Sequence, residues 1–493
     1  MKFTRRECLG VIIAVGGVSA CSSPASNSSG QSSTPAKGPD PTSPSPSPSP
    51  ITPSGPTFTP EEYGAVGDGQ ANDTDAFAKM AAAVNKTGGG TIVLRMTTYL
   101  VGKQGPDPTS PYAFAPAQIM ELDGCTQALT ILGNGARLKC ADGLRFGTFS
   151  PATGLATQHP VPFYDVTEVA SPYRAMITVQ NCKGKVRIEN VELDGNLANL
   201  VVGGPYGDTG RQIPATGLRL LNNSGGEYVV GVHSHHHALD GVLIDNAPDR
   251  TATTTLENVT SEYNARQGCS IVGGRNYNFL NCKFNHTGKA ALMSAPGAGV
   301  DIESEVNPIR NLSFSGCEFS NNSGVGMLAD SGDTDSATFD TCRFVGTTSW
   351  SAWPCKPHFR FNDCQFVGAI VQTFGATDPK SAVQFTRCSF VDDPSLSPTG
   401  EVFGTTYTIA DLGAGDLNVL FDSCRFSLKN NLVLPWSASS IYNNCAMSQL
   451  SSRQSYPRGT FTGVNTIDGN VDIYGSKVIG SLTINGSVIP PTG

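Results

Sequence analysis

The feature that most constrains this chain is a six-residue motif that recurs seven times in its C-terminal half. Each copy has the form Phe-x-x-Cys-x-Phe, the last one degenerate, and the copies are Phe279–Phe284, Phe314–Phe319, Phe339–Phe344, Phe361–Phe366, Phe385–Phe390, Phe421–Phe426 and Tyr442–Met447. The motif cysteines (282, 317, 342, 364, 388, 424 and 445) are 35, 25, 22, 24, 36 and 21 residues apart. A period in the twenties predicts a solenoid, whose short strand-like units must stack to bury their apolar sides.

The composition agrees with a β-rich solenoid. Charged residues make up 15% of the 493 residues, below the ~25% of ordinary globular proteins, and the 55 glycines suit tight corners. The net charge is −8 and no basic run is present, which argues against nucleic acid as a partner. No internal apolar run is long enough to be a transmembrane helix.

Fourteen cysteines in an exported protein would ordinarily indicate disulfides. Seven of them occupy one repeat position, however, where coils would be ~4.8 Å apart but parallel side chains rarely reach the disulfide dihedral angle. We therefore expect a ladder of small buried thiols. No cysteine pair has zinc-finger spacing, and no metal site is expected among them.

Residues 1–21 resemble an export signal, with a basic start, an apolar run and the ending Val18–Cys21. This ending resembles a bacterial lipobox, which implies that Cys21 is lipidated, and the paired arginines resemble a twin-arginine signal. The alternative is an unmodified Cys21 in a discarded peptide. We expect an exported protein, tethered to the bacterial cell envelope only through Cys21. The Ser- and Pro-rich residues 22–57 predict an extended linker, which leaves 58–493 as one folded domain.

The folded part opens with YGAVGDGQANDTDAF at Tyr63–Phe77, followed by a helix expected over 74–86 and by GGGTIVL at Gly88–Leu94. Together these segments resemble the entry block of the pectate-lyase-like (pectin-lyase fold) right-handed parallel β-helix superfamily. Only Asn72 departs from the superfamily pattern, in which two Asp are usual at this point. The resemblance covers roughly 60–480.

This resemblance implies an all-β fold, a single right-handed parallel β-helix with a short N-terminal capping helix. It is specific for the fold and not for an activity. Asp68 and Asp73 of the entry block are expected to serve in a turn and a helix cap. Asn190 and Asn258 stand where other coils have Cys, and we expect them to satisfy backbone groups at corners.

A second strand can be aligned on a glycine in four coils. The aligned segments are Gly241–Asp245, Gly268–Val272, Gly299–Glu303 and Gly326–Asp330. Because strand side chains alternate, residues one and three after the glycine are predicted inside, and residues two and four outside. The last outward column carries Asp245, Glu303 and Asp330, and Asp301 shares its face.

Coil spacing predicts how far apart these carboxylates are. Glu303 and Asp330 would be about 5 Å apart, Asp245 about 10 Å from Glu303, and Asp301 about 7 Å from Glu303. Glycosidases place two carboxylates ~5 Å apart for retention and ~6.5–9.5 Å for inversion. Two carboxylates stacked this closely also raise the pKa of one of them, as a general acid requires. The alternatives are a solvated acidic stripe or a Ca²⁺ site. A strand at Ala290–Met293 would instead move Asp301 and Glu303 onto a loop.

Four of the seven histidines fall within one five-residue stretch beside this face. In an extended chain His233 and His235 share a side, which His237 can join, and imidazole suits proton transfer or metal ligation. We expect His235 and His237 to be catalytic and His233 to bind substrate, with corner packing as the alternative. His286 is expected at the equivalent corner two coils on and is also predicted to bind substrate. Arg266 would bind a carboxylate or hold the acidic column, unless it is a solvated surface arginine.

Trp350 and Trp353 lie one coil beyond Asp330, and the 25-residue step places Trp353 on the outward parity of Leu328. A Trp beside carboxylates is a common stacking platform for sugars, whose faces are apolar. Core packing is the alternative for Trp350. Lys356 is expected to balance the acidic charge, and all three residues are predicted to bind substrate.

These features predict a surface-tethered enzyme acting on a polysaccharide, a glycoside hydrolase that uses Glu303 with Asp301, Asp330 or Asp245. The superfamily resemblance implies hydrolysis or β-elimination, although polygalacturonase-like G-H-G and R-I-K signatures and a pectate-lyase-like Ca²⁺ set are absent. A lyase with a histidine base and a non-catalytic carbohydrate-binding or structural β-helix remain alternatives. No cofactor is expected, apart from Ca²⁺ at an acidic stripe. The oligomeric state stays open, with a trimer as one option.

Overall fold

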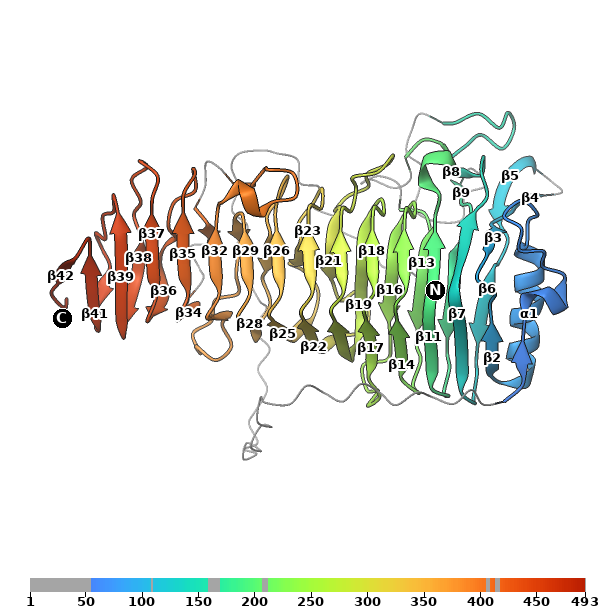
Figure 1. Cartoon of the computed structure of the whole chain (residues 1–493), viewed down its shortest axis with the longest axis horizontal. Helices are drawn as coiled ribbons and strands as arrows, with labels where there is room; N and C mark the ends of the chain where they lie inside the picture. The colour runs from blue at the N-terminus through green and yellow to red at the C-terminus, as the bar shows by residue number, and fades with distance from the viewer. Residues whose placement is uncertain are drawn as a thin grey trace.

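The computed structural model describes residues 55–107, 110–157, 169–205, 212–404, 408–412 and 417–492. These residues wind into one right-handed parallel β-helix, which confirms the predicted fold class (Figure 1). The expected export signal, Cys21 and nearly all of the expected linker lie outside the described residues. No helix in the described ranges is both long and apolar enough to cross a membrane.

Helix α1 (Thr74–Thr87) closes the N-terminal end of the β-helix, as predicted (Figure 1). The Asp73 carboxylate, just before the helix, accepts hydrogen bonds from the backbone N–H of Val66 (2.7 Å) and Gly67 (3.2 Å). The carboxylate of Asp68 accepts two backbone N–H bonds of 2.8 Å in the preceding turn. Both acids therefore have local structural partners. Three 3₁₀-helices are η1 (Pro60–Tyr63), η2 (Leu197–Asn199) and η3 (Pro394–Leu396).

Each coil contributes strands to up to three ladders, which we call faces 1, 2 and 3. Face 1 holds the first half of each Phe-x-x-Cys-x-Phe motif. Its strands are β1 (Thr57–Phe58), β2 (Gly90–Val93), the starts of β7 (Leu129–Cys140) and β11 (Val186–Asp194), β14 (Glu227–Val230), β17 (Thr254–Glu257), the end of β19 (Gln267–Leu280), β22 (Ile309–Ser315), β25 (Thr334–Asp340), β28 (Phe359–Asn362), β31 (Gln384–Thr386), β34 (Leu420–Asp422), β36 (Trp436–Asn443), β38 (Arg458–Thr462) and β40 (Lys477–Val478).

Face 2 follows face 1 in each coil after a short bend. Its strands are β3 (Thr98–Val101), the ends of β7 and β11, β15 (His233–His235), β18 (Thr260–Glu262), β20 (Lys283–Asn285), β23 (Glu318–Ser320), β26 (Arg343–Val345), β29 (Gln365–Val367), β32 (Ser389–Val391), β35 (Arg425–Leu428), β37 (Ala446–Gln449), β39 (Val464–Gly469), β41 (Ser481–Ile484) and the antiparallel β42 (Ser487–Ile489).

Face 3 is reached through a second corner. Its strands are β6 (Met120–Asp123), β10 (Ala175–Gln180), β13 (Thr216–Leu221), β16 (Asp240–Asp245), the start of β19, β21 (Ala298–Ile302), β24 (Met327–Ala329), β27 (Ala352–Pro354), β30 (Ile370–Val371) and β33 (Ala410–Asp411). Outside the three faces lie the hairpin β4 (Gln104–Asp107) and β5 (Ser110–Pro116), and the small sheet of β8 (Arg145–Thr148), β9 (Val169–Ala170) and β12 (Val201–Val202).

Left-handed backbone makes both bends of the coil. At the bend between faces 1 and 2, Asn190 and Asn258 have φ of 53° and 52°, so they lie at a corner as predicted. Asn tolerates this conformation because its short side chain can bond locally. The prediction that these two residues stand at the Cys position is wrong, because the register aligns Asn258 with Asn281 and places the buried Val259 opposite Cys282. The bend between faces 2 and 3, which we call the 2–3 corner, has φ of 56° or 57° at equivalent positions of successive coils, namely His236, Tyr263, His286 and Asn321.

The motif residues build the core. Phe339 is fully buried and stacks on Phe314 and Phe361, with ring centroids 4.8 and 4.7 Å apart. The seven motif cysteines are free and at most 2% exposed, as the predicted thiol ladder requires. Each thiol donates to the coil before it; Cys342 Sγ, for example, lies 3.4 Å from the carbonyl oxygen of Phe314. The motif is thus a scaffold element.

Candidate active site

The outer side of face 3 carries Asp301 in the predicted register, whereas a bulge shifts Asp245 out of the column predicted for it. Ser270 pairs with Asp301, Asp301 with Leu328, and Leu328 with Trp353, so these side chains form one outward column across four coils. The alternating inward residues are all fully buried, namely Val242, Cys269, Val300 and Met327. The strand of this coil is β21, whereas the rival segment Ala290–Met293 lies in a turn region.

Glu303 and Asp330 are neighbours in this register. Glu303 follows Asp301 by two residues and Asp330 follows Leu328 by two residues. Extending the Asp301–Leu328 register past the ends of β21 and β24 therefore puts the two acids on adjacent rungs. Burial, and next the negative charge of Glu303, raise the pKa of Asp330. The hydroxyl of Ser331 donates a 2.7 Å hydrogen bond to Glu303 Oε1. The pair thus combines a carboxyl group that holds its proton more tightly with a carboxylate that is hydrogen-bonded.

Lys356 lies near enough to this pair for its charge to act on Asp330. Its side chain is 8% exposed, and Nζ donates to the carbonyl oxygen of Gly332 at 2.9 Å. Burial lowers the pKa of Lys356, against the opposing effects of Asp330 and Glu303. The lysine in turn lowers the pKa of Asp330.

The other two predicted carboxylates have different surroundings. Asp301 is 3% exposed and accepts a hydrogen bond from Nε2 of Gln267 on Oδ2. Asp245, on β16, is half-buried and pairs with Gly273 at a bulge. Burial raises the pKa of Asp245, and Asn307 Nδ2 donates to its Oδ1 at 3.4 Å. Asp301 is therefore a positioned, buried acid beside the pair, and Asp245 is set apart from it.

Arg266 belongs to this face, but its partner is Asp240, which sequence reasoning did not single out. Arg266 Nε donates to Asp240 Oδ1 at 2.7 Å, Nη2 donates to Oδ2, and the side chains are 8% and 0% exposed. Ser270 Oγ donates to the same carboxylate at 2.9 Å. A bidentate buried pair of this kind is rigid, so Arg266 holds the acidic face in place, which was one of its two predicted roles.

Arg219 is a second residue of this face that was missed. It lies outward on β13, one coil before Leu243, with which it pairs. Burial, and next the nearby Arg174, lower the pKa of Arg219. The sequence carried a signal for Arg219. It follows Gly217 by two residues, and in the aligned coils the residue two positions after the glycine points outward.

The two tryptophans meet at one end of the acidic face. Trp353 and Trp350 are half-buried, with ring centroids 5.8 Å apart at 69°. Both pack on a small outer apolar cluster that contains Leu328. Trp350 also packs on Phe403, with ring centroids 5.4 Å apart. Trp353 therefore lies in line with Asp301 as predicted, and Trp350 is packed on protein on two sides.

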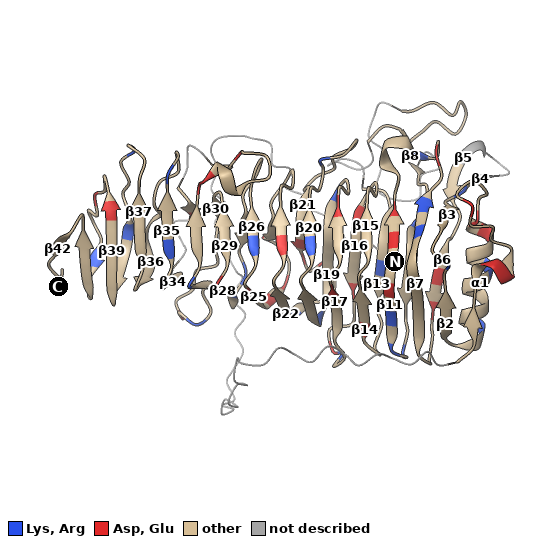
Figure 2. Cartoon of the chain, in the orientation of Figure 1, with Lys and Arg blue, Asp and Glu red and all other residues tan. Residues whose placement is uncertain are grey.

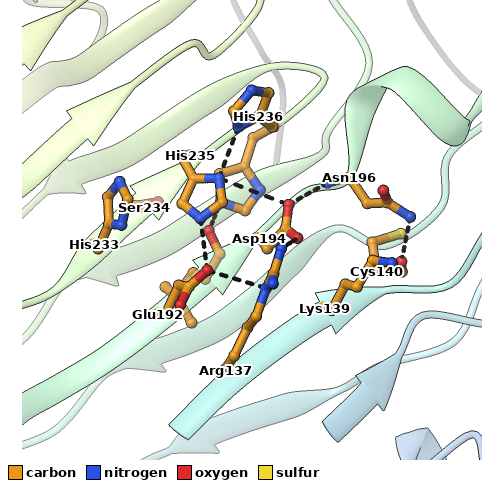
Figure 3. A network of polar contacts seen from close by, with 12 residues as sticks. Arg137, Lys139, Cys140, Glu192, Asp194, Asn196, His233, Ser234, His235 and His236 are labelled. Carbon is orange, nitrogen blue, oxygen red and sulfur yellow. Dashed lines mark hydrogen bonds and ion pairs between the residues drawn. The ribbon is translucent and has the colours of Figure 1, made fainter. Parts of the chain in front are cut away.

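The histidines His233 and His235 lie on the adjoining face 2, not on face 3. Basic residues at the end of β7 lie there beside acidic residues at the end of β11 (Figure 2). His235 Nε2 is 3.1 Å from Glu192 Oε1 (Figure 3). His233 Nε2 is 3.0 Å from Glu262 Oε1. Both glutamates were missed, because only the strand register places them beside the histidines.

Asp194 and Arg137 complete this network of polar contacts (Figure 3). Arg137 bridges the acids, with Nε 3.0 Å from Glu192 Oε1 and Nη2 bonded to Asp194 Oδ2. Asp194 Oδ1 is 3.7 Å from His235 Nδ1, which is 2.7 Å from Nδ1 of His236. Burial lowers the pKa of both His235 and His236. The network groups two imidazoles and carboxylates on the outside of the coil.

His237 points into the coil, away from both faces. It is fully buried, with Nδ1 2.8 Å from the Tyr173 hydroxyl and Nε2 3.1 Å from the Leu193 carbonyl oxygen. Burial lowers the pKa of His237 to about 3. Two hydrogen bonds engage both ring nitrogens, so this histidine has the environment of a core residue, the alternative that the sequence left open.

His286 occupies the 2–3 corner, as expected. Rings stack along this corner, with centroids 5.2 Å apart for His236–Tyr263 and 4.7 Å for Tyr263–His286. Beside His286 lies a pocket of about 360 Å³ lined also by Glu318, Ser320, Arg343 and residues 395–398. It opens on face 2, and the acidic pair of face 3 does not line it.

No protein-family model and no curated protein matches the chain. Among solved structures it is similar to the A-module of mannuronan C-5 epimerase AlgE4 from Azotobacter vinelandii, with 16% identity over 86% of this chain and 100% of that one and a TM-score of 0.45. It is similar to tailspike protein gp49 of Acinetobacter baumannii bacteriophage Fri1, a capsular polysaccharide depolymerase, with 13% identity over 85% of this chain and 63% of that one and a TM-score of 0.41. It is also similar to the Streptococcus pneumoniae surface protein and adhesin PfbA, with 14% identity over 88% of this chain and 98% of that one and a TM-score of 0.34. At these identities the likeness concerns the fold alone.

Proposed function

We propose that this protein is a polysaccharide-active enzyme, a glycoside hydrolase whose active site is the outer side of face 3. The observation that carries the proposal is the Glu303–Asp330 pair, one rung apart, in which burial and the Glu303 charge raise the pKa of Asp330. A general acid requires a carboxyl group that holds its proton more tightly, as Asp330 does, with a second carboxyl group beside it.

Asp330 is the proposed general acid. It donates its proton to the glycosidic oxygen as the bond from that oxygen to the anomeric carbon breaks. Glu303, held by Ser331, attacks the anomeric carbon and forms a glycosyl-enzyme ester. Water then cleaves the ester while Asp330 takes up its proton. A spacing of one rung, ~4.8 Å between strands, fits the ~5 Å separation of retaining enzymes.

The rest of face 3 has groups for binding a glycan. Trp353 offers a partly exposed ring in line with the acids, and an indole ring stacks on the apolar side of a sugar. Arg219 offers a guanidinium for hydroxyl or carboxylate groups. The Asp240–Arg266 pair is already saturated by mutual hydrogen bonds, so it positions the face and is not expected to bind substrate.

A glycan panel assayed for new reducing ends and for the absorbance of unsaturated uronates tests this proposal. We expect reducing ends without unsaturated products, and a loss of about 10²–10⁴-fold in turnover for Glu303→Gln and for Asp330→Asn. Asp249→Asn, at an exposed loop acid, is the matched control and should keep full activity.

Other outcomes of this panel would decide against hydrolysis on face 3. Unsaturated products that depend on His235 would indicate β-elimination with a histidine base on face 2. Glycan retention without any product would indicate a carbohydrate-binding β-helix. Full activity in both carboxylate variants would place the reaction elsewhere on the molecule.

A further inference from the structure

A second cluster of chemically active side chains lies at the 2–3 corner, outside the proposed hydrolytic site. Asp194 ends β11, His235 ends β15 directly above it in the register, and His236 is the next residue, at the corner itself. One ligand atom from each of the three side chains lies within 4.8 Å of the other two. We propose that these residues bind a divalent transition-metal ion, with Zn²⁺ as the best-fitting ion.

The distances between the ligand atoms support a shared ion. His235 Nδ1 is 2.7 Å from His236 Nδ1 and 3.7 Å from Asp194 Oδ1. Ligands about 2.0–2.1 Å from a tetrahedral Zn²⁺ are about 3.3 Å from one another. The two distances bracket this value, so a small rotation of the His236 ring would bring all three atoms to coordination distance.

The protons can be accounted for. At 2.7 Å one Nδ1 must donate to the other, and a bound ion replaces that hydrogen bond. Metal ligation takes the lone pair of both Nδ1 atoms, and the displaced proton moves to Nε2 of the same ring or to solvent. Binding therefore requires both rings to be neutral.

The surroundings orient the ligands as metal sites require. His235 Nε2 lies 3.1 Å from Glu192 Oε1, so the nitrogen remote from the ion has a carboxylate partner (Figure 3). Such carboxylate–histidine–metal arrangements fix the tautomer and the ring orientation. Arg137 holds the other carboxylate oxygen of Asp194, Oδ2, and the Asn196 backbone N–H donates to Oδ1 at 2.8 Å.

The donor set selects the class of ion. Two imidazole nitrogens and one carboxylate oxygen suit Zn²⁺ or a neighbouring transition metal, whereas Ca²⁺ and Mg²⁺ take oxygen ligands. Three protein ligands leave a fourth position for water or a substrate oxygen. The nearby acids Glu192 and Glu262 and the ligand Asp194 outnumber Arg137, which favours a cation at this corner.

Equivalent corners supply the matched variants. His236 has φ 56°, and the same corner position carries Asn321 with φ 56° three coils on. His236→Asn therefore removes a nitrogen ligand while keeping a residue that this backbone accepts. His286 lies at the same corner two coils on, with Asn321 Nδ2 2.9 Å from its Nδ1, so His286→Asn is the control.

Calorimetric titration of the untagged full chain with Zn²⁺, after treatment with a chelator, tests the proposal. We expect one equivalent to bind to the unaltered protein and to the His286→Asn variant, and affinity to fall by about tenfold or more in His235→Gln and His236→Asn. Co²⁺ in place of Zn²⁺ should give visible absorption bands that the same two variants lose.

Three outcomes would overturn the proposed metal site. These are that the unaltered protein binds no Zn²⁺, that His236→Asn binds Zn²⁺ as tightly as the unaltered protein, or that Ca²⁺ displaces Zn²⁺ at equal concentration. If His235→Gln does not fold, His236→Asn decides alone. Glycan turnover does not enter this test, so it is independent of the proposed hydrolase activity.

Discussion

The Tyr173 hydroxyl and the His237 imidazole form a 2.8 Å hydrogen bond inside the coil, where both side chains are fully buried. We predict that Tyr173→Phe lowers the free energy of unfolding by about 1–3 kcal/mol, because Nδ1 of His237 loses its donor in a buried site. Calorimetric unfolding measures this. Glycan turnover should be unchanged at a temperature where the variant is folded, whereas a fall in kcat without a loss of stability would make the pair catalytic.

Lys356 controls the proton affinity of the proposed acid. Because its charge lowers the pKa of Asp330, Lys356→Met should raise that pKa. An enzyme that needs protonated Asp330 loses activity as pH rises through this pKa, so the basic limb of kcat/KM should move to higher pH. Lys380→Met, an exposed lysine, should leave the profile in place. A basic limb that is unchanged or moves to lower pH in Lys356→Met contradicts the assignment of Asp330 as the general acid.

The retaining mechanism predicts chemical rescue. Glu303→Ala should lose at least about 10²-fold in turnover, and azide should restore part of it by taking the place of the missing carboxylate, forming a glycosyl azide that NMR can detect. Asp330→Ala keeps the nucleophile and should still form an ester with an activated substrate. Products with an inverted anomeric centre from the unaltered enzyme would instead indicate direct attack by water.

Trp353 is proposed to stack on the substrate. Trp353→Ala should raise KM by about two- to tenfold, since stacking of an aromatic ring contributes about 0.5–1.5 kcal/mol, with a smaller change in kcat. Steady-state kinetics on the best glycan of the panel measures both. Trp350→Ala should mainly reduce stability, because Trp350 packs on Trp353 and Phe403. Equal effects of the two variants on KM would argue against this division of roles.

The phenylalanine columns should be the most sensitive part of the scaffold. Phe339→Ala removes a fully buried ring that stacks on both neighbours, and we expect a cost of about 3–5 kcal/mol. Thermal unfolding checks this. Leu417→Ala, at an exposed position, should change stability by less than about 0.5 kcal/mol.

The sequence by itself predicted the parts of this protein that depend on a local period. The Phe-x-x-Cys-x-Phe spacing set the coil length, and the alternation of side chains in a strand then placed Asp301 and Trp353 in one outward column. The same alternation put Glu303 next to Asp330. These inferences held because neighbouring coils of a solenoid pair residue by residue, so a shift of one residue would turn apolar side chains outward.

Only the tertiary structure decided what happens at corners and between faces. At His236 the backbone turns into the left-handed region, so the next residue, His237, enters the core instead of sharing a side with His235. Arg266 bonds to Asp240, and His235 contacts Glu192, although the partners are 26 and 43 residues apart in the sequence. Such pairs depend on where a corner bends and how long each loop is, and neither follows from strand alternation.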